Sequence, residues 1–166
     1  MKKSKKVIFE ILSYVLIIVL VLLIKNYVAS PIRVNGNSMD DTLKDKDIMI
    51  LNEFTYYFND IERCDIVVVK EKGELLIKRV IGLPGEEIEC VEGSIYINNR
   101  ELTETYISGS TMDFEKVKLG KDEYFVLGDN REVSLDSRVY GAYKRKDIKG
   151  KASFTIYPFD RLGEKK

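Results

Sequence analysis

The stretch ELLIKRVI, residues 74–81, has the composition of a β-strand because apolar and branched side chains dominate it. Side chains alternate between the two faces of a strand, so Lys78 shares one face with Leu76 and Val80. Burial on an apolar face disfavours an ammonium ion and lowers the lysine pKa, as a general base at neutral pH requires. The alternative is a lysine at a sheet edge, where a charge protects against aggregation.

Other short runs of branched and aromatic residues are separated by turns rich in Gly, Asn and Asp, and no long stretch after residue 31 has helical periodicity. We therefore predict a mainly β protein, with an antiparallel β domain over residues 31–160 and a tail over 161–166. Residues 86–122 are richer in acids and turns, which indicates a small inserted β subdomain. Asn98-Asn99 is expected to form a hairpin turn. The predicted strands are residues 47–51, 66–69, 74–81, 94–97, 124–127 and 152–157.

The N-terminal segment is basic and then apolar. Lysines occupy positions 2, 3, 5 and 6, and residues 7–29 are long enough as a helix to span a bilayer core of about 30 Å. We expect a retained single-pass anchor in the cell membrane, with residues 1–6 cytoplasmic and everything after residue 30 outside. The alternative is a cleavable secretory signal peptide. Pro31 follows the best cleavage position and disfavours cutting there.

Composition excludes several classes of protein. The 166 residues are 45% hydrophobic and 33% charged, which is typical of a folded chain. Lys+Arg and Asp+Glu both total 27, so nucleic acid is not an expected partner. There is no histidine, so we expect no metal and no cofactor. Cys64 and Cys90 do not form a disulfide framework, and either a bridge or two free thiols fits the sequence.

A serine lies on a glycine-containing turn in NGNSMDDTL, residues 35–43. Gly36 allows the chain to turn tightly before Ser38, which can then present its hydroxyl beside free backbone N–H groups that stabilise an oxyanion. Without histidine, the base for such a serine would be a lysine kept neutral by burial, and Lys78 is the candidate. The alternative is an ordinary turn serine.

A polar loop, GDNREVSLDSR at residues 128–138, follows a predicted strand directly. Asp136 and Arg138 are expected to pair and brace this loop. Ser134 is a candidate for the group that orients the lysine amine, as a third residue orients the base of a catalytic triad. The alternative is a polar surface loop without a catalytic role.

Taken in order, these blocks resemble bacterial type I signal peptidases of peptidase family S26, in the short, single-anchor form of Gram-positive bacteria. The matching residues are Gly36, Ser38, Met39, Thr42 and Leu43; 65–68; 78–85; and 128–131 with Ser134, Asp136, Ser137, Arg138 and Gly141.

The resemblance implies a membrane-bound serine endopeptidase that removes signal peptides from exported preproteins and cuts after small residues at the first and third positions before the bond. It implies Ser38 as nucleophile and Lys78 as general base, with Ser134, Asp136 and Arg138 supporting them. The oxyanion hole would lie at the turn of Gly36 and Ser38. Here Gly36 stands where some relatives carry a serine, so no side-chain donor is expected.

The implied partners are the signal peptides of preproteins and the lipid bilayer, while the oligomeric state is left open. Met39, Leu76 and Ile77 are expected to line the substrate groove. The aromatic segment FTYYF, residues 54–58, is assigned to a membrane-facing surface, the groove or ordinary core.

Asp41 stands where the family usually has proline, and Cys64 where a glycine is common. A second acid beside the nucleophile could loosen the turn or raise the pKa of Lys78. An alternative function is therefore a weakened or inactive paralogue that acts as a membrane-tethered binding or assembly factor. A self-cleaving Ser-Lys protease is a further alternative.

Overall fold

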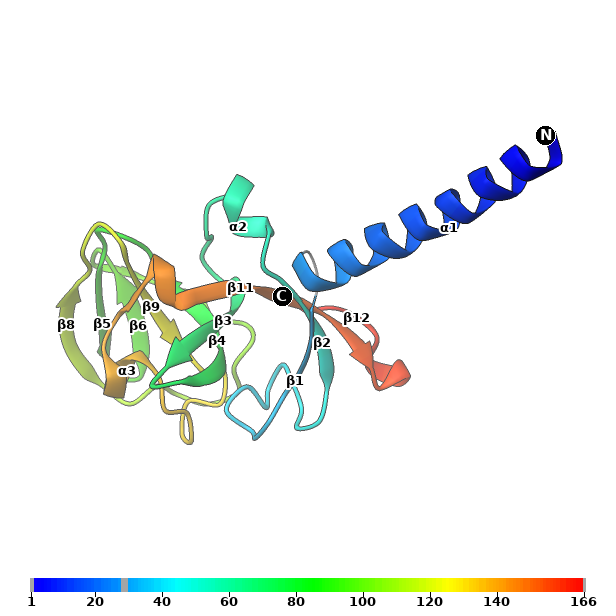
Figure 1. The fold of residues 1–166 in the computed structure, drawn as a ribbon. Helices are drawn as coiled ribbons and strands as arrows, with labels where there is room; N and C mark the ends of the chain where they lie inside the picture. The colour runs from blue at the N-terminus through cyan, green and yellow to red at the C-terminus, as the bar shows by residue number, and fades with distance from the viewer. Residues whose placement is uncertain (1, 28–29, 166) are drawn as a thin grey trace.

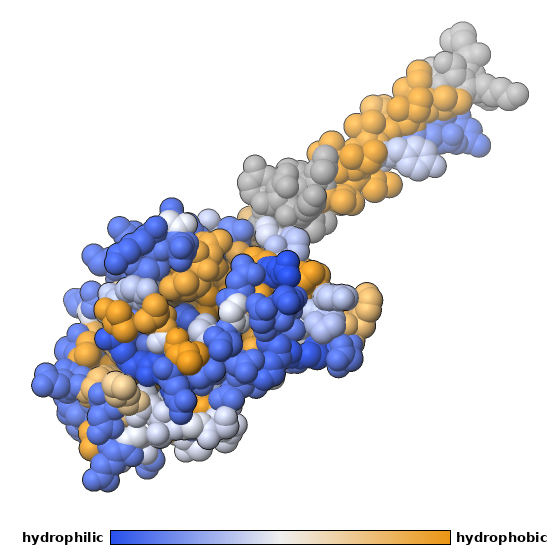
Figure 2. All heavy atoms as spheres, turned by 90° about the horizontal axis from the view of Figure 1, so that it is seen from below, coloured by the Kyte–Doolittle hydropathy of each residue, from blue (hydrophilic) through white to orange (hydrophobic). Residues whose placement is uncertain are grey.

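The computed structural model describes residues 2–27 and 30–165. Helix α1 (Lys2–Tyr27) projects away from a body of strands in Figure 1. It includes most of the helix predicted over residues 7–29, of which residues 28 and 29 lie outside the described part. Its apolar side chains from Val7 to Val21 are exposed, and Figure 2 shows apolar side chains along the coloured part of this helix. Within the described residues, no helix meets the length and hydropathy that crossing a membrane requires.

The larger sheet has eight antiparallel strands in the order β1-β2-β11-β3-β4-β9-β10, with β12 pairing β11. The last long strand of the chain, β11, therefore lies between β2 and β3 in the middle of this sheet. Its strands are β1 (Ser30–Arg33), β2 (Ile48–Asn52), β3 (Ile66–Glu71), β4 (Glu74–Gly82), β9 (Glu123–Leu127), β10 (Tyr143–Lys144), β11 (Ile148–Tyr157) and β12 (Gly163–Glu164).

The smaller sheet has the order β7-β6-β5-β8 and is drawn at the left of Figure 1. Its four strands all lie within the predicted subdomain, residues 86–122. Asn98 and Asn99 connect β6 to β7 with φ values of 50° and 62°, the left-handed conformation that a two-residue hairpin turn requires. The predicted turn is confirmed. The strands are β5 (Glu87–Val91), β6 (Ser94–Ile97), β7 (Arg100–Glu101) and β8 (Phe114–Lys118).

Short helical turns connect some of the strands: α2 (Thr55–Phe58), α3 (Ser137–Tyr140), and the 3₁₀ turns η1 (Arg145–Asp147) and η2 (Phe159–Arg161).

The aromatic segment 54–58 is divided between core and surface. Tyr56 is buried and donates a hydrogen bond to Asp65 (2.7 Å), whereas Tyr57 and Phe58 are exposed.

Three apolar clusters form the core. The first joins the serine-bearing turn to the larger sheet, because Met39 and Leu43 pack against Met49, Leu51 and Ile66. Met39 and Leu43 are both fully buried. Full burial of one such side chain stabilises a fold by about 1.5–3 kcal/mol, so the turn is firmly attached to the sheet.

Candidate active site

The turn over residues 35–43, called the nucleophile turn below, is held by backbone geometry at both ends. Gly36 has a φ of +86°, and its N–H donates to Oδ1 of Asp45 (2.9 Å). The N–H of Leu43 donates to the carbonyl of Met39 (2.6 Å). Ser38 is half-buried on this turn. The Gly36 N–H is therefore already bonded, whereas no hydrogen bond from the Ser38 N–H is found among the described residues.

Lys78 lies near the centre of β4, opposite Val67 of β3. Leu76 and Val80 belong to the second apolar cluster, and Ile77 packs against the first, so the predicted alternation is correct. Only 2% of Lys78 is exposed. Its Nζ lies 2.7 Å from Oγ of Ser38, within hydrogen-bond distance. The structure therefore brings the candidate nucleophile and the candidate base into direct contact.

Burial lowers the pKa of Lys78 to about 8 because an ammonium ion is poorly solvated there. The negative charge of Asp136 opposes this shift, and the positive charge of Arg138 adds to it. A sizeable fraction of the amine is therefore neutral near physiological pH, as a general base must be.

The loop over residues 128–138 begins beside Lys78, because β9 ends at Leu127, which pairs with Arg79. The N–H of Asn130 donates to the carbonyl of Ser38 (3.1 Å). A Cβ added to Gly128 would lie 2.2 Å from Oγ of Ser134 and 2.4 Å from the carbonyl oxygen of Ser38. Only glycine permits the loop to approach the nucleophile turn this closely.

Asp136 and Arg138 form the ion pair that the sequence predicted. The Arg138 guanidinium donates twice to the carboxylate (2.9 and 2.8 Å), and the Gly128 N–H donates to the same group (3.0 Å). Burial acts to raise the pKa of Asp136, but the bonds from Arg138 and Gly128 outweigh it and hold the pKa below its usual value. The Asp136 carboxylate is fully buried and charged within the loop, where it joins Arg138 to the N–H of Gly128.

Ser134 is buried, and its Oγ has no hydrogen-bond partner of full geometry among the described residues. Its hydroxyl nevertheless contributes to the lowered pKa of Asp136. The expected orienting contact with Lys78 is thus not a hydrogen bond in this structure. Ser134 remains a candidate for the residue that orients the lysine amine, because its hydroxyl and the Ser38 carbonyl both lie close to Gly128.

The sequence did not reveal a buried network around Arg79. Its guanidinium donates to both carboxylate oxygens of Asp129 (2.8 and 2.6 Å), to the hydroxyl of Thr42 (3.2 Å) and to the carbonyl of Cys64 (3.0 Å). Its carbon Cζ lies 4.0 Å from the centre of the Tyr106 ring. The network joins the nucleophile turn, β4 and the 128–138 loop. One signal was available, since an arginine inside an apolar strand needs a buried partner.

Two of the three expected groove residues remain candidates. Leu76 and Ile77 are half-buried. Met39 is 1% exposed, packs in the first apolar cluster and accepts a hydrogen bond from the Asp129 N–H at sulfur (3.4 Å). The expectation that the Met39 side chain lines a groove is therefore wrong. Its shape and polarity fit the core better than the surface.

The two acids of the nucleophile turn make different contacts. Asp40 pairs with Lys44 on the surface (3.1 Å). Asp41 instead accepts hydrogen bonds from Ser108, in the connection between β7 and β8. The charges that act on the Lys78 pKa are those of Asp136, Arg138 and Asp129, so neither acid of the turn is among them.

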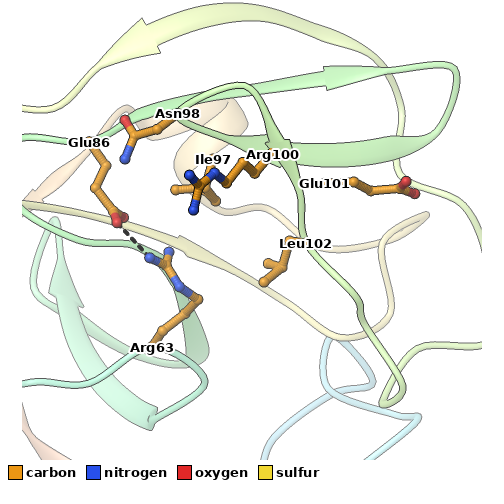
Figure 3. A pocket seen from close by; sticks show the side chains of 7 residues that line it. All are labelled: Arg63, Glu86, Ile97, Asn98, Arg100, Glu101 and Leu102. Atoms are coloured by element: carbon orange, nitrogen blue, oxygen red, sulfur yellow. Dashed lines mark hydrogen bonds and ion pairs between the residues drawn. The ribbon is translucent and has the colours of Figure 1, made fainter.

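A cavity of about 450 Å³ lies beside the smaller sheet (Figure 3), and neither Ser38 nor Lys78 is among its lining residues. Arg63 extends toward Glu86 there and forms an ion pair with it (2.5 Å). Positive and negative side chains line it in equal number, so it has no strong preference for a charged ligand. The lining residues are Arg63, Glu86, Ile97, Asn98, Arg100, Glu101 and Leu102.

The two cysteines, for which the sequence allowed either a bridge or two free thiols, are not bridged in the structure. Cys64 and Cys90 are both free thiols.

The sequence also matches a known protein family. The profile of the family described as "Signal peptidase, peptidase S26" matches residues 8–157. The chain belongs to this family. As an S26 protein it falls among the signal peptidases, which are hydrolases.

Similar S26 proteins align over nearly the whole chain. Signal peptidase I P of Bacillus subtilis subsp. natto is 37% identical over 93% of this chain and 90% of its own length. Signal peptidase I S of Bacillus subtilis (strain 168) is 35% identical over 96% of this chain and 94% of its own length.

A solved structure shows the same fold over part of the chain. The crystal structure of a signal peptidase I from Enterococcus faecalis V583 is 33% identical, with a TM-score of 0.51. The aligned region covers 56% of this chain and 97% of that one.

Proposed function

We propose that this S26 protein is a membrane-bound serine endopeptidase that removes signal peptides from exported preproteins with a Ser38–Lys78 dyad. The observation that carries this proposal is the 2.7 Å contact between Nζ of Lys78 and Oγ of Ser38, made by a lysine that is 2% exposed. A serine activated by a lysine of lowered pKa is a working alternative to the Ser-His pair.

In this mechanism the neutral Lys78 amine accepts the hydroxyl proton as Oγ of Ser38 attacks the scissile carbonyl carbon. The Ser38 N–H donates to the oxyanion that forms. The Lys78 ammonium then gives its proton to the departing amine, the C–N bond breaks, and an acyl-Ser38 ester remains. Water, deprotonated by Lys78, hydrolyses the ester and restores the serine.

The surrounding residues are assigned supporting roles. The Asp136–Arg138 pair holds the 128–138 loop against the nucleophile turn and sets opposing charges near Lys78. Ser134 orients the lysine amine when the site is occupied. Leu76 and Ile77, beside the base on β4, form walls of a shallow groove that an extended peptide enters by strand addition. Small residues before the cut fit such a groove.

Residues 7–29 are proposed as a retained single-pass anchor, with residues 1–6 in the cytoplasm and residues 31–160 outside. The exposed apolar side chains along the described part of α1, from Val7 to Val21, support this placement. Anchoring raises the effective concentration of enzyme where signal peptides emerge from the membrane. Within the outer part, residues 86–122 form the inserted subdomain.

The test is cleavage of a preprotein in liposomes, read by intact mass, with the full-length chain. Ser38→Ala and Lys78→Ala should abolish cleavage. The matched controls, Ser110→Ala and Lys70→Ala, change an exposed serine and an exposed lysine and should cut at the wild-type rate. Cleavage that survives in Ser38→Ala would contradict the proposal. An inert wild type that folds would favour the binding-factor alternative, and shortening of the purified chain alone would favour self-cleavage.

A further inference from the structure

The connection between β7 and β8, residues 102–113, leaves the smaller sheet and reaches the nucleophile turn. Ser108 in this connection donates twice to the carboxylate of Asp41, from its N–H (3.0 Å) and from its hydroxyl (2.8 Å). The two residues are 67 positions apart in the chain. Asp41 follows Ser38 by three residues in the same turn.

The same connection is held a second time, by a buried arginine of the 128–138 loop. Arg131, 4% exposed, donates to both carboxylate oxygens of Glu104 (2.9 and 2.5 Å) and to the hydroxyl of Thr111 (2.5 Å). Its Nε donates to the carbonyl of Gly128 (3.0 Å). Gly128 in turn lies so near the Ser38 carbonyl and Ser134 that an added Cβ would overlap both.

These contacts connect the nucleophile turn to the β7–β8 connection by two routes. On one side, Asp41 of the turn bonds to Ser108 of the connection. On the other side, Arg131 bonds the connection to the carbonyl of Gly128, which lies beside the Ser38 carbonyl. We propose that Asp41 is a positioning residue, which fastens the β7–β8 connection to the nucleophile turn through Ser108 and so holds Ser38 at its distance from Lys78. The proposal rests on the proposed function, because positioning matters only if Ser38 reacts.

The charge of Asp41 serves this contact and not the chemistry of Lys78. Bonds from the Ser108 N–H and hydroxyl hold the pKa of Asp41 below its usual value, so it stays ionised wherever Lys78 is neutral. Asp41 is not among the groups that shift the Lys78 pKa. Loss of the contact should therefore slow turnover without moving the pH dependence.

The experiment is a double-mutant cycle on cleavage by the full-length chain. Asp41→Ala and Ser108→Ala should each lower kcat about fivefold with KM unchanged, as expected for loss of a hydrogen-bonded charge contact. The double variant should be no worse than either single one, because both remove the same contact. Ser108→Thr keeps the hydroxyl and should restore the rate, and Ser110→Ala should match wild type. The pH midpoint of kcat should be the same throughout.

Wild-type kcat in both single variants would overturn the proposal, as would losses that multiply in the double variant. A shifted pH midpoint in Asp41→Ala would assign Asp41 an electrostatic role through Lys78 instead. Amide hydrogen exchange separates this failure from failure of the proposed function, because faster exchange at Ser108 in Asp41→Ala reports the contact without turnover. An inert wild type with that exchange response would overturn the proposed function and, with it, the catalytic role of the contact.

Discussion

Arg79 and Asp129 form an ion pair in which neither side chain is exposed to solvent. Two hydrogen bonds join them, of 2.8 and 2.6 Å, and the pair connects β4 to the first residues after β9. Arg79 also follows Lys78 directly in the chain, so the Arg79–Asp129 pair and the Lys78–Ser38 contact share strand β4.

Removing one partner of this buried pair should strongly destabilise the fold. Asp129→Ala removes the carboxylate that pairs with the buried Arg79 guanidinium, and we expect the free energy of unfolding to fall by about 3–5 kcal/mol. Glu87→Ala is the control, since it breaks an exposed pair with Lys118 and should cost about 1 kcal/mol or less. Urea denaturation of both variants is the measurement. Equal, small losses would show that the buried pair contributes no more than a surface one.

The rate should depend on pH through the state of Lys78. Burial lowers its pKa to about 8, and only the neutral amine can accept the Ser38 proton. We therefore expect kcat/KM to rise with pH, about tenfold per unit below the midpoint, and to level off above about pH 8. Initial rates of cleavage across this range are the measurement. A rate that falls as pH rises through the midpoint would contradict the assignment of Lys78 as base.

Arg138 should tune that midpoint. Its positive charge helps to lower the Lys78 pKa, whereas the charge of Asp136 raises it. Arg138→Gln removes the first effect and leaves Asp136 unpaired, so the midpoint should move to higher pH and the rate at neutral pH should drop. Recovery of the rate in alkaline buffer is the distinguishing result. Arg100→Gln, an exposed arginine, should leave the profile unchanged.

Ser134→Ala should separate catalysis from stability. The Ser134 hydroxyl is buried and has no full hydrogen bond among the described residues, so its removal should change the free energy of unfolding by less than about 0.5 kcal/mol. If the hydroxyl orients Lys78 in the occupied site, turnover should still fall about tenfold to hundredfold. Thermal melts and cleavage assays on one preparation decide between the two effects. Unchanged turnover would remove Ser134 from the proposed mechanism.

Gly128→Ala should impair both properties together. The new Cβ would lie 2.2 Å from Oγ of Ser134 and 2.4 Å from the Ser38 carbonyl oxygen, and the loop must move away to relieve the overlap. We expect a loss of about 1–3 kcal/mol in the free energy of unfolding, together with reduced cleavage. Gly109→Ala is the matched control, because no atom lies within 4 Å of its added Cβ. Normal activity in Gly128→Ala would mean that the close approach is not needed.

The sequence predicted elements whose signal is local. The six predicted strands are all present, because each has a dense run of branched or aromatic side chains. The strand β1 was missed because Pro31 interrupts its pattern, and β5 and β8 were missed because charged residues occupy many of their positions. The helical turns α2 and α3 have four residues each, too few for a helical period to appear.

The sequence predicted the candidate site where a charged residue stands among apolar neighbours. Lys78 inside an apolar strand is such a residue, and its alternation with Leu76 and Val80 is as predicted. Contacts between distant segments left no local pattern, so neither the Arg79–Asp129 pair nor the Asp41–Ser108 contact was foreseen. Met39 was misassigned because proximity in sequence to Ser38 does not determine the direction in which a side chain points.

The central position of β11 has a consequence for when the enzyme can first work. This strand, residues 148–157, follows every other strand of the larger sheet except β12 in the sequence, yet it separates β2 from β3, which both lie between Ser38 and Lys78 in the sequence. The strands β1 and β2 cannot pair with the rest of the larger sheet until β11 has been synthesised, because β11 alone pairs with both β2 and β3 among the described strands. A chain whose translation has not yet reached β11 should therefore have no proteolytic activity. Assembly of the site should be among the last events of folding, and a domain with so many distant pairings should fold slowly.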